Sequence, residues 1–70
     1  MDRIEVQSTT IASVGYDVNN SLLEVEFRRG GVYQYYDVPE YQYSALISAD
    51  SLGRYFVANI RNVYRCSRIG

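Results

Sequence analysis

Residues 22–37 read LLEVEFRRGGVYQYYD, and this stretch decides the fold. Its first half alternates apolar and charged residues, which is the period of a strand with one buried face. One face of this strand carries Leu23, Val25 and Phe27. The opposite face carries Glu24, Glu26 and Arg28. Gly30-Gly31 permits the positive φ angles of a tight turn, and Val32–Asp37 then returns with tyrosines on both faces. The stretch, with strands Leu22–Arg28 and Val32–Asp37, predicts an antiparallel hairpin.

Two further strands are predicted before the hairpin, at Ile4–Ser8 and Thr10–Asp17. Gly15, within the second of these, indicates a bulge or the close approach of another backbone segment. After the hairpin the period changes. Val38-Pro39-Glu40 is typical of a helix start, with the proline at the first helical position. The helical spacing predicts a buried stripe of Tyr43, Leu46 and Ile47.

A second helix is predicted from Ser51 to about Asn62, with Asp50 or Ser51 as its cap. At 100° per residue, four apolar residues fall within about 80° of one another: Leu52, Phe56, Ile60 and Val63. An extended tail follows, and its alternation also fits a short strand. The expected fold is α+β: one domain over residues 1–70, with a small antiparallel sheet of three to four strands followed by two short helices and a possible short C-terminal strand.

Composition bears on assembly and location. A chain of 70 residues with one cysteine and no histidine lacks a disulfide or zinc staple. Its hydrophobic content is 47%, and eight residues are tyrosine. We therefore expect a homo-oligomer or a ligand surface, because not all of these rings fit inside so small a core. The first residues form no apolar run, so we expect no membrane association. A free cysteine fits a cytoplasmic protein of bacteria, or of the host cytoplasm if phage-encoded.

Charge is segregated along the chain. Residues 1–50 hold three arginines and all eight acidic residues, a formal charge of −5. Residues 51–70 hold four arginines and no acidic residue, a formal charge of +4: Arg54, Arg61, Arg65 and Arg68. Every cation is arginine, whose planar fork suits phosphate and carboxylate. The C-terminal part is therefore expected to meet an anionic partner.

In order and spacing, several short motifs resemble the KTSC domain, a family named after the C-terminal region of some lysyl-tRNA synthetases. The motifs, spread from about Ser8 to Tyr64, are Ser13-Val14-Gly15-Tyr16-Asp17, Leu23–Phe27, Gly30–Tyr35, Val38-Pro39 with Tyr43, and Ser51–Phe56 with Ile60 and Tyr64. The resemblance implies a small α+β fold in a bacterial or phage protein, and no established common activity. Where many members have asparagine after the Tyr-Phe pair, this chain has Val57, and Asn59 is the nearest substitute.

The residues argue against catalysis. Without histidine, Ser-His-Asp and Cys-His arrangements are absent. Glu24 and Glu26 share a strand face as paired carboxylates can, but a solvated face is the simpler interpretation. Cys66 has only Arg65 and Arg68 as charged neighbours along the chain, and neither acts as a base. No residue set has metal-ligand spacing, so we expect neither an enzyme nor a cofactor.

The predicted binding site is the arginine side of the second helix. Arg54, Arg61, Arg65 and Asn59 are expected to hold an anion, and Tyr55 or Tyr64 to stack on a base. Arg28 and Arg29, before the glycine pair, are candidates for contributing across a subunit boundary. A plain solvated face remains the alternative for both groups.

Three functions follow, in order of preference. The first is non-catalytic binding of a small phosphate-bearing nucleotide, such as a signalling nucleotide that is sensed or sequestered, at a subunit interface. The second is RNA or tRNA binding through the basic end, which the net charge of −1 restricts to a small patch. The third is a structural or protein-interaction homo-oligomer without a small ligand, joined through its acidic strand face and basic helix face.

Overall fold

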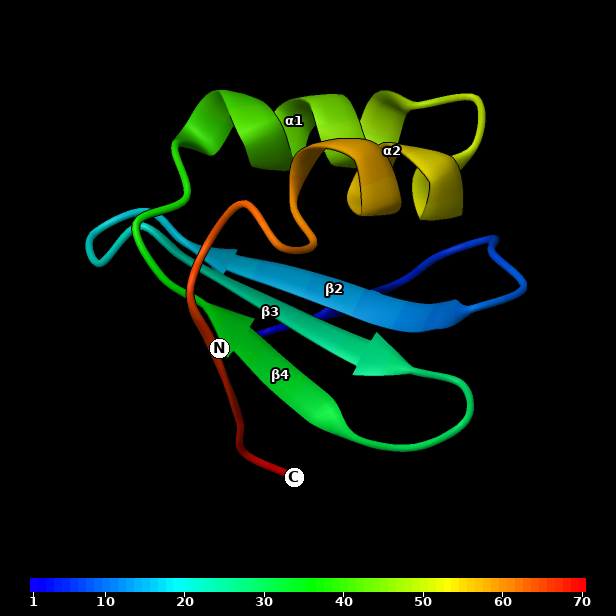
Figure 1. Ribbon diagram of the computed structural model, residues 1–70, viewed down its shortest axis with the longest axis horizontal. Helices are drawn as coiled ribbons and strands as arrows, with labels where there is room; N and C mark the ends of the chain where they lie inside the picture. The colour runs from blue at the N-terminus through cyan, green and yellow to red at the C-terminus, as the bar shows by residue number, and fades with distance from the viewer.

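A computed structural model describes residues 1–70 as one five-stranded antiparallel sheet with two helices. Figure 1 shows that both helices lie over the same face of the sheet. The elements are β1 (Ile4–Glu5), β2 (Ile11–Asp17), β3 (Leu22–Phe27), β4 (Val32–Tyr35), α1 (Glu40–Ser48), α2 (Leu52–Asn59) and β5 (Cys66–Arg68). Neighbouring strands in the sheet follow chain order. The expected α+β architecture is confirmed, with the extended tail forming β5 beside β4.

The predicted hairpin forms between β3 and β4, one residue shorter on the first strand and two on the second. Leu23 pairs with Tyr35 and Val25 with Tyr33, so leucine, valine and tyrosine side chains share one face. Gly30 and Gly31 adopt φ angles of 115° and 97°, which glycine allows without strain. The turn is closed by the Phe27 amide, which donates to the Gly31 carbonyl at 3.0 Å.

The core lies between the sheet and the helices and contains ten buried hydrophobic residues. Those from the sheet and the segment after β4 are Ile11, Val14, Leu23, Val25, Tyr35 and Val38. Those from the α2 region and α1 are Leu46, Leu52, Phe56 and Ile60. Burial of such side chains is the main force that holds a domain of this size together.

Helix α1 departs from the prediction at two positions. Pro39 stands at the N-cap, and the helix begins at Glu40. Ile47, predicted to be buried, is 42% exposed, whereas Leu46 and Gln42 are buried. Tyr43 is half-buried and stacks on Tyr16 with ring centroids 5.3 Å apart. The inner face of α1 therefore carries Gln42, Tyr43 and Leu46 instead of Tyr43, Leu46 and Ile47. The side-chain amide of Gln42 takes the place that the sequence predicted for an apolar residue.

Helix α2 begins as predicted and ends earlier. Ser51 caps it, accepting a hydrogen bond from the Arg54 amide at 3.3 Å, and Leu52, Phe56 and Ile60 are buried. The last helical residue is Asn59 rather than Asn62. Val63, predicted on the buried face, is 60% exposed. The cause lies in the backbone: Asn62 takes a φ of 62°, which asparagine tolerates and a continuing helix does not.

The sheet face without helices carries a polar network. Glu24, predicted to be solvated, is only 6% exposed, because Arg3 forms an ion pair with it and Gln34 donates to it at 2.9 Å. The N-terminal segment crosses this face so closely that a Cβ on Gly15 would meet the Asp2 carbonyl oxygen at 2.6 Å. The predicted close backbone approach at Gly15 is therefore confirmed.

Neither helix has the length or the apolar character that crossing a membrane requires.

Candidate functional site

A cleft of about 470 Å³ opens beside α2 on the helix-bearing side of the sheet. It joins four segments that lie far apart in the sequence: the loop before β2, the β3–β4 hairpin, the end of α2 with the following turn, and β5. Its lining residues are Thr10, Phe27, Arg29, Gly30, Tyr33, Tyr35, Phe56, Arg61, Asn62, Tyr64 and Cys66. This volume lies within the range of small-molecule sites. We call this hollow the aromatic cleft.

Edge-to-face ring contacts build the floor of the aromatic cleft. Phe27 meets Tyr33 and Phe56, each with centroids 5.6 Å apart, and Tyr35 meets Phe56 at 5.5 Å. Such pairs add stability beyond their buried area and fix the orientation of each ring. The floor is therefore a connected aromatic surface held by packing from both the sheet and α2.

One wall is Tyr64, whose position is set from α1. The buried Gln42 side chain donates to the Tyr64 hydroxyl at 3.1 Å and accepts from the Tyr55 hydroxyl. This amide thus ties together α1, α2 and the segment that leads to β5. Tyr64 is half-buried, with its ring available along the cleft.

The rim carries two exposed arginines without acidic partners. Arg29 comes from the β3–β4 turn and Arg61 from the turn after α2. The only ion pair in the chain joins Arg3 to Glu24, on the other face of the sheet. No lining residue of the aromatic cleft is acidic. The two guanidinium groups therefore give the rim a positive charge that the chain itself does not neutralise.

Two further groups lie at the β4–β5 side of the aromatic cleft. Tyr35 is buried and stands opposite Cys66 in the strand pairing. Burial raises the pKa of Tyr35 to about 12, and the Arg61 charge offsets only part of that rise. Cys66 is a free, exposed thiol.

The structure brings three of the predicted site residues together at the aromatic cleft: Arg29, Arg61 and Tyr64. Arg68 lies close by, because a Cβ on Gly31 would contact both its guanidinium carbon, at 3.4 Å, and the Tyr33 ring, at 3.3 Å.

The other predicted site residues lie elsewhere. Arg54 is exposed on α2 outside the cleft, and Asn59 donates to the Tyr55 carbonyl at 3.1 Å. The Tyr55 hydroxyl is engaged by Gln42. Arg65 lies over the Tyr36 ring, 5.9 Å from its centroid. The arginines after residue 50 are thus free of acidic partners but do not form one continuous face.

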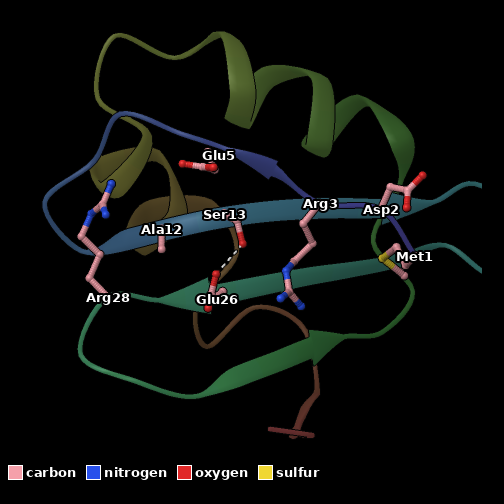
Figure 2. A pocket seen from close by; sticks show the side chains of 8 residues that line it. All are labelled: Met1, Asp2, Arg3, Glu5, Ala12, Ser13, Glu26 and Arg28. Carbon is pink, nitrogen blue, oxygen red and sulfur yellow. Dashed lines mark hydrogen bonds between the residues drawn. The ribbon is translucent and has the colours of Figure 1, made fainter.

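Arg28 borders a different hollow, on the helix-free face of the sheet. Figure 2 shows this second hollow, of about 470 Å³, lined by Met1, Asp2, Arg3, Glu5, Ala12, Ser13, Glu26 and Arg28. Arg28 donates to the Ser8 carbonyl at 2.6 Å and to the Val6 carbonyl at 3.1 Å, so it pins the β1–β2 loop. Arg3 pairs with Glu24, and Glu26 accepts from Ser13 at 2.8 Å. Three of the charged side chains that line this hollow, Arg3, Glu26 and Arg28, are therefore engaged by other groups of the chain.

Sequence reasoning missed several residues of the aromatic cleft, namely Thr10, Phe27, Tyr33, Tyr35 and Phe56. The strand period already placed Phe27, Tyr33 and Tyr35 on one face, and that was the available signal. The strand period could not predict that the two helices leave part of this sheet face uncovered.

The arrangement of the aromatic cleft suits binding. It offers flat rings, two guanidinium forks, a phenol and an amide. No group of three or more His, Cys, Asp or Glu side chains is close enough to hold a metal ion. A planar ligand that carries an anionic group matches these features best.

Comparison with known proteins places the chain in a family. The model of the KTSC domain matches residues 7–64. The crystal structure of a KTSC domain protein from Yersinia pestis superposes with a TM-score of 0.96 at 43% sequence identity, covering 99% of this chain and 97% of that one. An uncharacterised protein of Stutzerimonas stutzeri is 48% identical over 56 residues, 80% of this chain and 79% of that protein. A protein of Tsukamurella paurometabola is 33% identical over 60 residues, covering 86% and 90%. The family match over most of the chain and the close similarity of fold agree with the motifs in the sequence: the protein belongs to the KTSC domain family.

Proposed function

We propose that this protein is a non-catalytic binder of a small phosphate-bearing nucleotide, held in the aromatic cleft. One observation carries the proposal: connected aromatic rings and two arginines without acidic partners border the same hollow. Arg61 binds phosphate oxygens, because guanidinium forks match phosphate geometry, and Arg29 adds a second positive charge at the rim. The base stacks on an exposed ring, a contact worth about 1–3 kcal/mol in single-strand binders.

The contacts within the chain favour particular residues for stacking. Tyr33 and Tyr64 are half-buried and line the cleft, so each ring has a face to offer. Tyr55 is set aside, because its hydroxyl is tied to Gln42 and it does not line the cleft. A protein of this kind senses or sequesters a nucleotide signal.

A second copy of the chain completes the site in this proposal. The rim residues Arg29, Arg61 and Asn62 are exposed, so one chain leaves its ligand partly open to water. Val63, directly after the rim, is 60% exposed and offers apolar surface for a partner. Native mass spectrometry checks this point: a ligand retained only by a dimer or larger assembly supports it, and a ligand retained by single chains contradicts it.

Thermal unfolding with a ligand panel tests the function. The panel holds nucleoside mono-, di- and triphosphates and cyclic dinucleotides, each at millimolar concentration. A ligand that binds only the folded state at a hundred times its Kd adds about 2.7 kcal/mol of stability. At least one member should raise Tm by several degrees. No shift with any member overturns the proposal.

The matched variants are Arg61→Gln and Arg54→Gln. Both arginines are exposed and follow the same helix start, but only Arg61 lines the cleft. Loss of a charge-assisted hydrogen bond costs about 1.5–3 kcal/mol, so Arg61→Gln should weaken binding roughly 10- to 100-fold. Arg54→Gln should leave Kd unchanged. Equal effects of the two variants would show that binding depends on general charge.

General charge is the basis of the second candidate, RNA binding. One observation favours it: three exposed arginines lie outside the lining of the cleft and have no acidic partner, namely Arg54, Arg65 and Arg68. Binding of this kind weakens steeply with salt and depends on all of these arginines. Titration of single-stranded RNA at two salt concentrations distinguishes it from a small-ligand site.

A further inference from the structure

The Tyr35 side chain is a buried polar group that faces the aromatic cleft without an oxygen or nitrogen acceptor. The residue is 6% exposed and lines the cleft floor. Tyr35 is the only tyrosine in the buried core. Among the half-buried tyrosines, Tyr16 donates to the Val38 carbonyl, and Tyr55 and Tyr64 share Gln42. Cys66, which pairs with Tyr35 across β4 and β5, offers the Tyr35 hydroxyl a thiol, which is a weak acceptor.

The exposed part of Tyr35 must include its hydroxyl. No fully buried side-chain oxygen or nitrogen of this chain lacks a hydrogen-bond partner. The Tyr35 hydroxyl makes no hydrogen bond to an oxygen or nitrogen of the chain, and the Tyr35 side chain lines the cleft. Since buried polar groups are almost always paired, a donor left free at the floor of a hollow points to a ligand atom.

Two donors converge at this place. A phenol is protonated at neutral pH, so the Tyr35 hydroxyl acts as a donor, and burial raises its pKa further, to about 12. Arg61 lines the same cleft, at its rim. An arginine supplies donors only.

We propose that the Tyr35 hydroxyl and the Arg61 guanidinium together hold one oxygen-bearing anionic group of the ligand at the floor of the aromatic cleft. This inference deepens the proposed function and rests on it, because it names the residues that take the phosphate.

The inference also orients the ligand. The phosphate lies at the β4–β5 side, with Tyr35 and Arg61. The base lies toward the Phe27–Tyr33 ring pair, and Arg29 borders it from the hairpin turn. A ligand without an acceptor oxygen, such as an uncharged nucleobase, leaves the Tyr35 donor unsatisfied and binds poorly, because burying an unpaired donor is costly.

The test is Tyr35→Phe, with Tyr36→Phe as the matched control. Tyr36 follows Tyr35 directly but does not line the cleft. Removing a hydroxyl that has no good acceptor should leave the stability of the free protein unchanged or slightly higher. Two probes, inorganic phosphate and AMP, are titrated into each variant. Binding is followed by the shifts of amide NMR signals. Tyr35→Phe should raise Kd for both about tenfold, and Tyr36→Phe should not.

The outcomes separate the two proposals. If AMP binds the wild type and Tyr35→Phe binds both probes equally well, the oxyanion role of Tyr35 is overturned and the nucleotide function stands. If phosphate binding needs Tyr35 but AMP binds no tighter than phosphate, the oxyanion site stands and the nucleotide function falls. If neither probe shifts any cleft residue, the oxyanion role of Tyr35 is overturned, and the nucleotide function falls with it when no member of the thermal-unfolding panel raises Tm.

Discussion

Arg28 and Arg29 show how single residues take different roles at adjacent positions. Arg28 points to the helix-free side and holds the Val6–Ser8 loop by two carbonyl contacts. Arg29 borders the aromatic cleft with no acidic partner. β3 ends at Phe27, and both arginines lie in the turn that follows it. One arginine is therefore structural, and its neighbour is available to a ligand.

Glu24 gives a prediction at this scale. Burial alone would raise the pKa of this carboxyl, but hydrogen bonds from Gln34 and Arg3, with the Arg3 charge, outweigh burial and hold it below 4.5. The resulting stability is present above the unfolded-state pKa and is lost as pH falls through the lower folded-state pKa. At pH 7, Glu24→Gln should cost about 1–2 kcal/mol of unfolding free energy. The difference from wild type should shrink below about pH 4.5.

Urea unfolding between pH 3 and pH 8 measures this effect. The control is Glu26→Gln, on the same sheet face but bonded to Ser13 rather than to an arginine. Its cost should be smaller. A Glu24→Gln penalty that stays constant across the pH range would contradict the account.

At the scale of elements, α2 matters most, because it supplies Phe56 to the cleft floor and leads into Arg61. Its start depends on one local contact, from the Arg54 amide to the Ser51 hydroxyl oxygen. Ser51→Ala should lower unfolding free energy by about 1 kcal/mol. Ser48→Ala, at the end of α1, should change it by much less. Chemical denaturation measures both, and equal effects would mean that the cap is not a source of stability.

The sequence predicted those elements whose own residues determine their structure. The β3–β4 hairpin followed from alternation and Gly30-Gly31, and the start of α2 from Ser51 and its apolar spacing. The errors fall where tertiary contacts decide. Gln42 is buried because two tyrosine hydroxyls bond to it, and Glu24 because an arginine from the N-terminal segment reaches it. The residues around Gln42 and Glu24 in the sequence do not indicate these distant partners.

At the scale of the whole molecule, the aromatic cleft depends on topology. Its arginines are 32 positions apart in the sequence, at Arg29 and Arg61, and meet because the chain after α2 returns to lay β5 along β4. Figure 1 shows this return of the C-terminal segment beside β4. Charge segregation indicated which end of the chain was basic. It could not show that Arg65 would lie over Tyr36 while Arg61 borders the cleft.

The most direct test of the central claim is an amide NMR titration of the whole chain with AMP. We expect saturable shifts at the residues that line the aromatic cleft, at Arg29, Arg61 and Cys66, with none at Glu26 or Arg28 on the opposite face. Shifts confined to that opposite face, or no shifts at millimolar AMP, would contradict it.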